Sequence, residues 1–287
     1  PTSDSTLLID KYRLVQLLSL KDIGQHENKP APLKNAVLFG GIDYSADETA
    51  TKDSALSLLP EDRGMAAGFN YLQGTLTETQ QIQHLLQTIK ANALLYTAKD
   101  ATEEQFKQLS GNAPQVLHLA THGFFIQEAK EAKKSGSFGE NENAFTLANN
   151  PLMRGGLLLA GGNRAWKGLS TPKGKEDGVL TAYEVAALDL SNTQLVVLSA
   201  CQTGLGETGG TEGVFGLQRA FQVAGAKTII MSLWSVDDNA TQQLMTLFYQ
   251  NLLSGDTKKQ ALKEAQSDIM KKFKSPFFWG AFVMVGV

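Results

Sequence analysis

Two apolar runs of strand length each end in a short polar turn that contains glycine. One run, VLHLATHGFF at 116–125, carries His122 followed by Gly123; the other, LVVLSACQTG at 195–204, ends at Cys201, the only cysteine in the chain. In a parallel α/β sheet, residues just past the carboxyl ends of neighbouring strands meet at the edge where ligands bind. A cysteine and a histidine brought there form a nucleophile and its base, so the pattern indicates a cysteine peptidase.

The remaining sequence alternates strand and helix patterns, which is typical of a parallel sheet with helices packed on it. We predict a single α/β domain over 1–287, with strands at 12–20, 36–42, 93–97, 116–122, 155–162, 195–201, 227–234 and 277–285. Helices are expected at 78–91 and from 103, with Thr77 and Thr102 as their N-caps, and at 181–188, 211–224, 237–253 and 257–273. Polar stretches at 52–70 and 166–177 predict loops, and 127–150 predicts a mobile insertion.

The charge and the cysteine content limit which partners the protein can bind and which cellular compartment suits it. The net charge of -3 and the pI near 5.9 give no electrostatic case for binding nucleic acid or an anionic membrane. A single cysteine excludes an internal disulfide framework and a multi-cysteine zinc site, and it fits a reducing cytoplasm. No apolar run approaches the roughly 20 residues that span a bilayer, and no signal-peptide pattern opens the chain. Because the chain begins at Pro1, we expect a fragment of a longer protein with a regulatory N-terminal region.

Each residue of the expected pair has an ordinary structural alternative. Cys201 could be a small buried apolar residue, but Gly204 and Gly206 predict a turn that exposes it, and the dipole of a helix from Thr211 favours its thiolate. His122 could cap a backbone carbonyl. Gly123 would allow a sharp turn after it and place a backbone N–H as an oxyanion donor.

Two rival sites overlap these motifs. His118 and His122 have the spacing of a helical metal pair, but in a strand they lie about 13 Å apart, and Leu119 stands where a zincin has glutamate. We therefore expect no metal site and interpret His118 as a core histidine. The residues 204–209 match the dinucleotide fingerprint G-x-G-x-x-G, but they lie late in the chain and lack the expected acid about 20 residues on.

At these residues the chain resembles the CHAT domains, caspase-like peptidases often attached to tetratricopeptide repeats. The matching blocks are 120–125, 150–164, 177–185, 198–207, 212–221 and 232–238. The resemblance implies a caspase-like three-layer sandwich, with a central mostly parallel sheet and helices on both faces. It also implies Cys201 as nucleophile, His122 as its proton-transferring partner, the backbone N–H groups of Gly123 and Cys201 as oxyanion donors, and no cofactor.

The resemblance also points to the substrate pocket, which caspase-type enzymes build from the end of the first strand and the strand after the cysteine. Here those positions hold Asp43, Ser232, Trp234 and Asp237. Asp43 has an alternative as a turn residue, and Asp237 as a helix N-cap. No arginine is present there, so a carboxylate would favour Lys or Arg before the cut bond.

We therefore expect a regulated cysteine endopeptidase that cleaves a protein or peptide substrate. If it cleaves after basic residues, Lys130, Lys133 and Lys134 of the insertion are candidate self-cleavage sites. Two alternatives stay open: a catalytically idle CHAT scaffold or docking module, and a nucleotide-binding α/β domain.

Overall fold

The computed structural model describes residues 32–46, 68–126, 150–202, 211–234 and 237–286. Its centre is one sheet in the strand order β2-β1-β3-β6-β7-β8, with β4 paired to β3 and β5 paired to β4. The strands from β2 to β7 along this order run parallel, whereas β8, β4 and β5 join antiparallel. The strands are β1 (Asn35–Ile42), β2 (Asn92–Ala98), β3 (Val116–Phe125), β4 (Gly155–Leu158), β5 (Val179–Thr181), β6 (Leu195–Gln202), β7 (Thr228–Ser232) and β8 (Phe282–Gly286).

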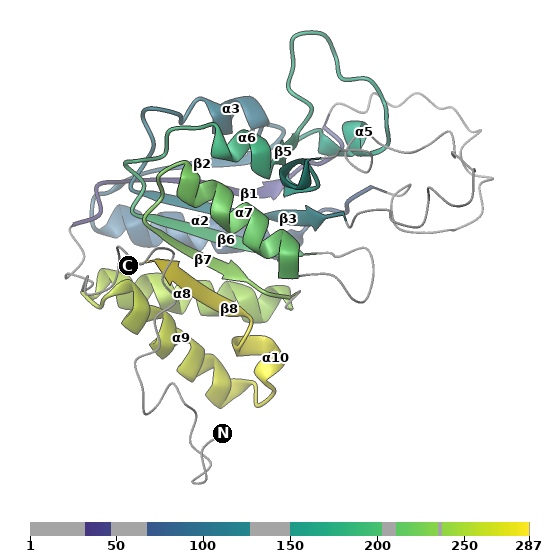
Figure 1. The fold of residues 1–287 in the computed structure, drawn as a ribbon. Coiled ribbons are helices and arrows are strands. Elements are labelled where there is room, and N and C mark those ends of the chain that lie inside the picture. Colours follow the sequence, from purple (N-terminus) through teal and green to yellow (C-terminus); the bar gives the residue numbers. More distant parts are fainter. Residues whose placement is uncertain (1–31, 47–67, 127–149, 203–210, 235–236, 287) are drawn as a thin grey trace.

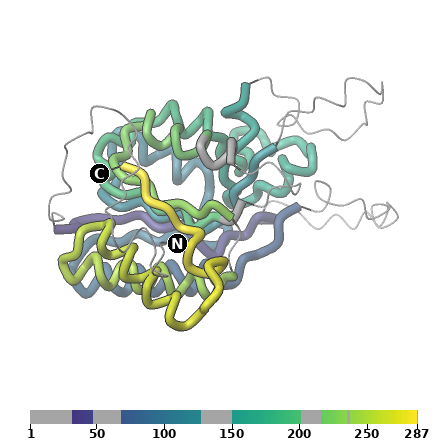
Figure 2. Tube along the Cα trace, turned by 60° about the horizontal axis from the view of Figure 1, so that its bottom comes forward, coloured from purple at the N-terminus to yellow at the C-terminus, as the bar shows by residue number. Residues whose placement is uncertain are grey.

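Helices cover both faces of the sheet, so the molecule has three layers (Figures 1 and 2). One face packs against α3, α6 and α7, and the other against α2, α8 and α9. The helices are α2 (Gln73–Thr88), α3 (Glu103–Lys107), α5 (Gly162–Trp166), α6 (Ala182–Ala186), α7 (Thr211–Val223), α8 (Asp238–Leu253), α9 (Lys258–Lys272) and α10 (Pro276–Trp279), with a 3-10 turn η3 at Pro151–Met153. The predicted three-layer α/β sandwich with a mostly parallel sheet is confirmed.

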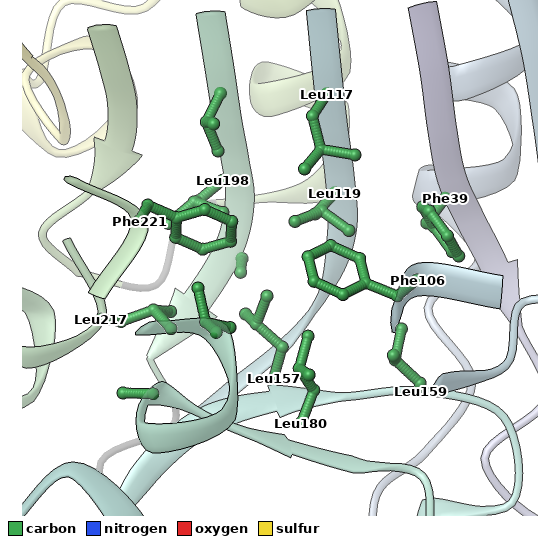
Figure 3. Packing of buried hydrophobic residues seen from close by; sticks show 14 of the residues in the cluster. Phe39, Phe106, Leu117, Leu119, Leu157, Leu159, Leu180, Leu198, Leu217 and Phe221 are labelled. Atoms are coloured by element: carbon green, nitrogen blue, oxygen red, sulfur yellow. The ribbon is translucent and has the colours of Figure 1, made fainter. Parts of the chain in front are cut away.

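The strands build two cores because successive side chains leave opposite faces of the sheet. In β3, Leu117 and Leu119 enter the core beneath α3 and α7, while Val116 enters the core beneath α2 and α8. Figure 3 shows the first of these cores, in which leucines of the sheet meet Phe106 of α3 and Phe221 of α7. Both faces of the central strands are therefore apolar, as expected for a parallel sheet covered on both sides.

The start of α2 corrects one prediction. The helix begins at Gln73, five residues before the expected start, and Thr77 lies inside it instead of capping it. The Thr75 hydroxyl donates to the Leu72 carbonyl and accepts from the Gly41 N–H, so the first turn is fixed by contact with β1. Helix α2 can lie this close to β1 because residue 40 is a glycine: a Cβ there would come within 2.6 Å of Thr79.

The C-terminal strand is shorter than predicted. Residues 276–279 form α10, and β8 starts only at Phe282. The Ser275 side chain accepts from the Phe277 N–H, and Pro276 occupies the first helical turn, where its missing N–H costs nothing. The N-cap of α3 by Thr102 is confirmed.

Several predictions fall outside the described residues: the strand at 12–20, the glycine motif at 204–209, the lysines of 130–134 and most of the expected loops at 52–70 and 127–150. No helix in the described part of the chain is long and apolar enough to cross a membrane.

Candidate catalytic site at the carboxyl edge of the sheet

His122 and Cys201 are direct neighbours across two parallel strands. The register of β3 against β6 pairs their Cα atoms, although the residues lie far apart in the sequence. Neighbouring strands are spaced about 4.8 Å apart. The predicted meeting of these two residues at the carboxyl edge of the sheet is therefore present in the backbone, which is the part of Cys201 that the structure describes.

A backbone carbonyl fixes the tautomer of the His122 ring. Nε2 lies 2.8 Å from the carbonyl oxygen of Asn70. Because a carbonyl can only accept, Nε2 carries the proton and donates it, which leaves Nδ1 of the neutral ring with a lone pair. Nδ1 is buried and has no hydrogen-bond partner within the described residues. It is the nitrogen able to take up a proton.

Two aromatic rings hold the imidazole between them. The centroids of Tyr44 and Phe69 each lie 5.0 Å from the His122 ring, which is only 7% exposed. Burial lowers the pKa of His122 below its ordinary value of 6.5, while the Asn70 carbonyl and the charge of Asp238 act in the opposite direction. The net lowering keeps the ring neutral at pH 7.

The Tyr44 ring is itself fixed by strand β3. Its hydroxyl lies 3.0 Å from Thr121 Oγ1, and the Thr121 hydroxyl donates to the carbonyl of Leu158. Burial raises the pKa of Tyr44, so the phenol stays protonated across the physiological range. Tyr44 is thus a rigid wall beside the imidazole.

Strand β3 does not end at His122, which corrects another prediction. It continues to Phe125, and Gly123 pairs with Leu157 of β4 on one side and with Gln202 of β6 on the other. The expected sharp turn at Gly123 is absent because β4 extends the strand beyond its parallel part.

The four predicted pocket residues have different environments. Asp43 is exposed just past β1, and its Oδ1 accepts from the Ser45 N–H at 3.0 Å. Ser232 is buried and donates to the carbonyl of Ala200 at 2.8 Å, next to Cys201. Trp234 donates through Nε1 to the carbonyl of Phe277, and Asp237 caps α8.

His118 has no role at this site. It is fully buried, with Nε2 2.8 Å from Glu78 Oε1 and Nδ1 3.2 Å from the Tyr249 hydroxyl. Its interpretation as a core histidine is confirmed.

A separate cluster of carboxylates surrounds one lysine. Oxygen atoms of Glu103, Glu176 and Glu184 lie within 4.8 Å of one another, a spacing that could hold a metal ion. The Lys107 ammonium lies 2.7 Å, 2.8 Å and 2.9 Å from these three side chains. Burial alone would lower the pKa of Lys107, but the three contacts raise it overall, so the ammonium occupies the position that a cation would take.

Sequence reasoning missed the residues that hold His122 in place. Tyr44 and Phe69 are aromatic, and such residues occur in every core, so their type gives no signal. Asn70 acts through its backbone carbonyl, a group that all residues share. Only the nearness of Tyr44 to the end of an expected strand pointed to this edge.

Comparison with known proteins places these features in context. A family model described as CHAT domain matches residues 1–287. Tetratricopeptide repeat protein 28 of Homo sapiens and that of Mus musculus are each 36% identical over 110 residues, which cover 38% of this chain and 4% of either relative. Among solved structures, the Arg-specific cysteine proteinase gingipain R is 10% identical, with 88% of this chain and 46% of that chain covered and a TM-score of 0.48.

Proposed function

The chain belongs to the CHAT domain family, and from this premise we propose that it is a cysteine endopeptidase with Cys201 as nucleophile and His122 as base. One observation carries the proposal. The strand register places His122 beside Cys201, and the hydrogen bond from Nε2 leaves Nδ1 as the basic nitrogen of the ring. Nδ1 has no hydrogen-bond partner in the described part of the chain. A nucleophile and a base held this way are what acyl transfer requires.

The reaction follows from these two groups. Nδ1 accepts the thiol proton of Cys201, and the thiolate sulfur adds to the carbonyl carbon of the scissile peptide bond. The protonated ring then gives this proton to the leaving amine, and a thioester remains. Water, deprotonated by Nδ1, attacks the thioester and returns the free thiol and a carboxylate product. The family resemblance assigns the backbone N–H groups of Gly123 and Cys201 to the developing oxyanion; because Gly123 pairs with both β4 and β6, this role would require β3 to part from a neighbouring strand when substrate binds.

The Asn70 carbonyl assists the step in which charge develops. When Nδ1 takes up a proton, the hydrogen bond from Nε2 to this carbonyl becomes charge-assisted and shortens. The low pKa of His122 leaves the ring neutral and ready to accept a proton at pH 7. Both effects favour His122 as the base of the free enzyme.

Asp43 gives the substrate preference that we propose, cleavage after Lys or Arg. Its exposure screens the attraction for a cation, so we expect the Asp43→Asn substitution to reduce turnover of basic substrates by less than about fivefold. Labelling of Cys201 by a small thiol reagent should not change. A library profile that favours Asp, or one that is indifferent to charge in both proteins, contradicts the assignment.

Regulation of the enzyme and its cellular compartment are also proposals. The curated relatives are named for tetratricopeptide repeats, which supports regulation by an N-terminal region or a partner protein. A reactive thiol on the chain's one cysteine is suited to the reducing cytoplasm.

Cleavage of a peptide library by the purified chain, with Cys201→Ala as the paired control, tests the proposed function. We expect sequence-selective cleavage by the wild type and none by the variant. Equal cleavage by both would place the activity elsewhere. Absence of cleavage together with an unreactive thiol would favour an idle scaffold, and a thermal shift with nucleotides would favour the nucleotide-binding alternative.

A further inference from the structure

We propose that Asn163 is a positioning residue for His122, acting through the backbone of residues 69 and 70. The proposal rests on the proposed function, because it gives His122 a role that its orientation serves. Asn163 lies in α5, and its side chain does not contact the imidazole through any hydrogen bond within the described residues.

The Asn163 amide holds one residue by both of its backbone groups. Oδ1 accepts from the Phe69 N–H at 2.6 Å, and Nδ2 donates to the Phe69 carbonyl at 2.9 Å. The second Nδ2 hydrogen donates to Ser45 Oγ at 3.0 Å, and the side chain is only 4% exposed. The amide therefore pairs with Phe69 as a neighbouring strand would, and both of its donor hydrogens are used.

Through these hydrogen bonds, Asn163 positions the two aromatic rings that pack on the imidazole and the carbonyl that accepts its proton. Phe69 packs against His122, and the next residue is Asn70, whose carbonyl accepts from Nε2. The backbone N–H of Asn163 also donates to the carbonyl of Tyr44 at 2.9 Å. One residue of α5 thus ties the turn after β1 to the segment that fixes the ring tautomer.

The site is built for an amide. Gly68 has a φ of +73°, and a Cβ there would lie 2.8 Å from Asn163 Oδ1, so the chain approaches the amide more closely than a larger residue allows. Aspartate at position 163 would keep the acceptor but lose both donors, and it would direct a lone pair at the Phe69 carbonyl. Alanine would leave the N–H and the carbonyl of Phe69 without this partner.

Nitrogen-15 NMR of histidine-labelled protein tests the positioning directly. The experiment uses the full chain with Cys201→Ala, so that catalysis plays no part. We expect His122 to be protonated at Nε2 alone, and Asn163→Ala to convert it into a mixture of tautomers. The buried His118 serves as an internal reference and should not change. If Asn163→Ala fails to fold, Asn163→Asp is measured instead, with the same expectation.

The control for a general loss of packing is Asn251→Ala. Asn251 lies in α8, and its Nδ2 also donates to a backbone carbonyl, that of Ala261. The Asn251→Ala substitution should leave the His122 tautomer unchanged. A single Nε2-protonated form in the Asn163 variants, an equal change in Asn251→Ala, or a wild-type ring protonated at Nδ1 would each overturn the proposal.

Kinetics add a second readout that separates positioning from folding. We expect Asn163→Ala to lower kcat by about 10- to 100-fold with KM changed less than about threefold, because a misplaced base slows the chemical step. A kcat of Asn163→Ala within about threefold of the wild-type value would overturn the proposal. If the wild type shows neither turnover nor a reactive Cys201 thiol, the proposed function fails, while the NMR result still decides whether Asn163 positions the ring.

Discussion

At the scale of single residues, the environment of His122 decides its chemistry. A carbonyl fixes the proton on Nε2, and two aromatic rings pack against the imidazole. The ring is therefore uncharged in the resting protein, with its basic nitrogen Nδ1 buried. His84, by contrast, is exposed on α2.

The pKa of His122 is the first prediction at this scale. In the Cys201→Ala protein, we expect its NMR titration midpoint below 6.5, because burial disfavours the charged ring. Asp238→Asn should lower it further, since that carboxylate favours the charged form. The unfolded chain takes up this proton near 6.5 and the folded chain only at lower pH. The contribution of His122 to the free energy of unfolding therefore falls as the pH drops below about 6.5. A midpoint at or above 6.5 would contradict the assignment.

At the scale of secondary-structure elements, Lys107 connects three segments. It reaches from α3 to Glu176 in the segment before β5 and to Glu184 in the first turn of α6. Glu103, its partner within α3, is 1% exposed and also accepts from the Gly178 N–H. This network holds the β5 region against α3, on the face of the sheet that carries α7.

Removal of this lysine should be costly. We expect Lys107→Met to lower the free energy of unfolding by about 2 kcal/mol, because the buried Glu103 side chain loses its cation. Burial raises the pKa of Glu103 to about 8, so this side chain then binds a proton at neutral pH. The double variant Lys107→Met, Glu103→Gln should recover part of the loss, since a buried glutamine needs neither a cation nor a bound proton. Chemical denaturation of the wild type, Lys107→Met, Glu103→Gln and the double variant measures the coupling. Losses that simply add would show that the pair is not coupled.

At the scale of the whole molecule, one sheet is shared by two cores. Each central strand gives alternate side chains to both, so neither core can form without the sheet. We expect Phe221→Ala in one core and Phe248→Ala in the other to shift the same single unfolding transition, each by about 3–5 kcal/mol. The unfolding transitions followed by circular dichroism and by tryptophan fluorescence should coincide. Two separate transitions, each moved by one variant alone, would contradict a single domain.

The sequence predicted what depends on side-chain pattern and parallel topology. Apolar runs with polar ends were enough to bring His122 next to Cys201, because parallel strands present their carboxyl ends on one edge. It could not predict that the Asn70 carbonyl accepts from His122 Nε2, because tertiary packing brings this backbone group to the ring. The start of α2 was missed for a similar reason, since contact with β1 overrides a local capping pattern at Thr77.

The dependence of peptide turnover on both members of the pair is the most direct test. Wild type, Cys201→Ala, His122→Ala and the double variant are compared on the best library peptide, with His84→Ala as the control on an exposed histidine. We predict that each single variant abolishes turnover, that the double variant is no worse than either, and that His84→Ala matches the wild type. Substantial turnover by Cys201→Ala, or full activity of His122→Ala, would contradict a catalytic dyad at this edge of the sheet.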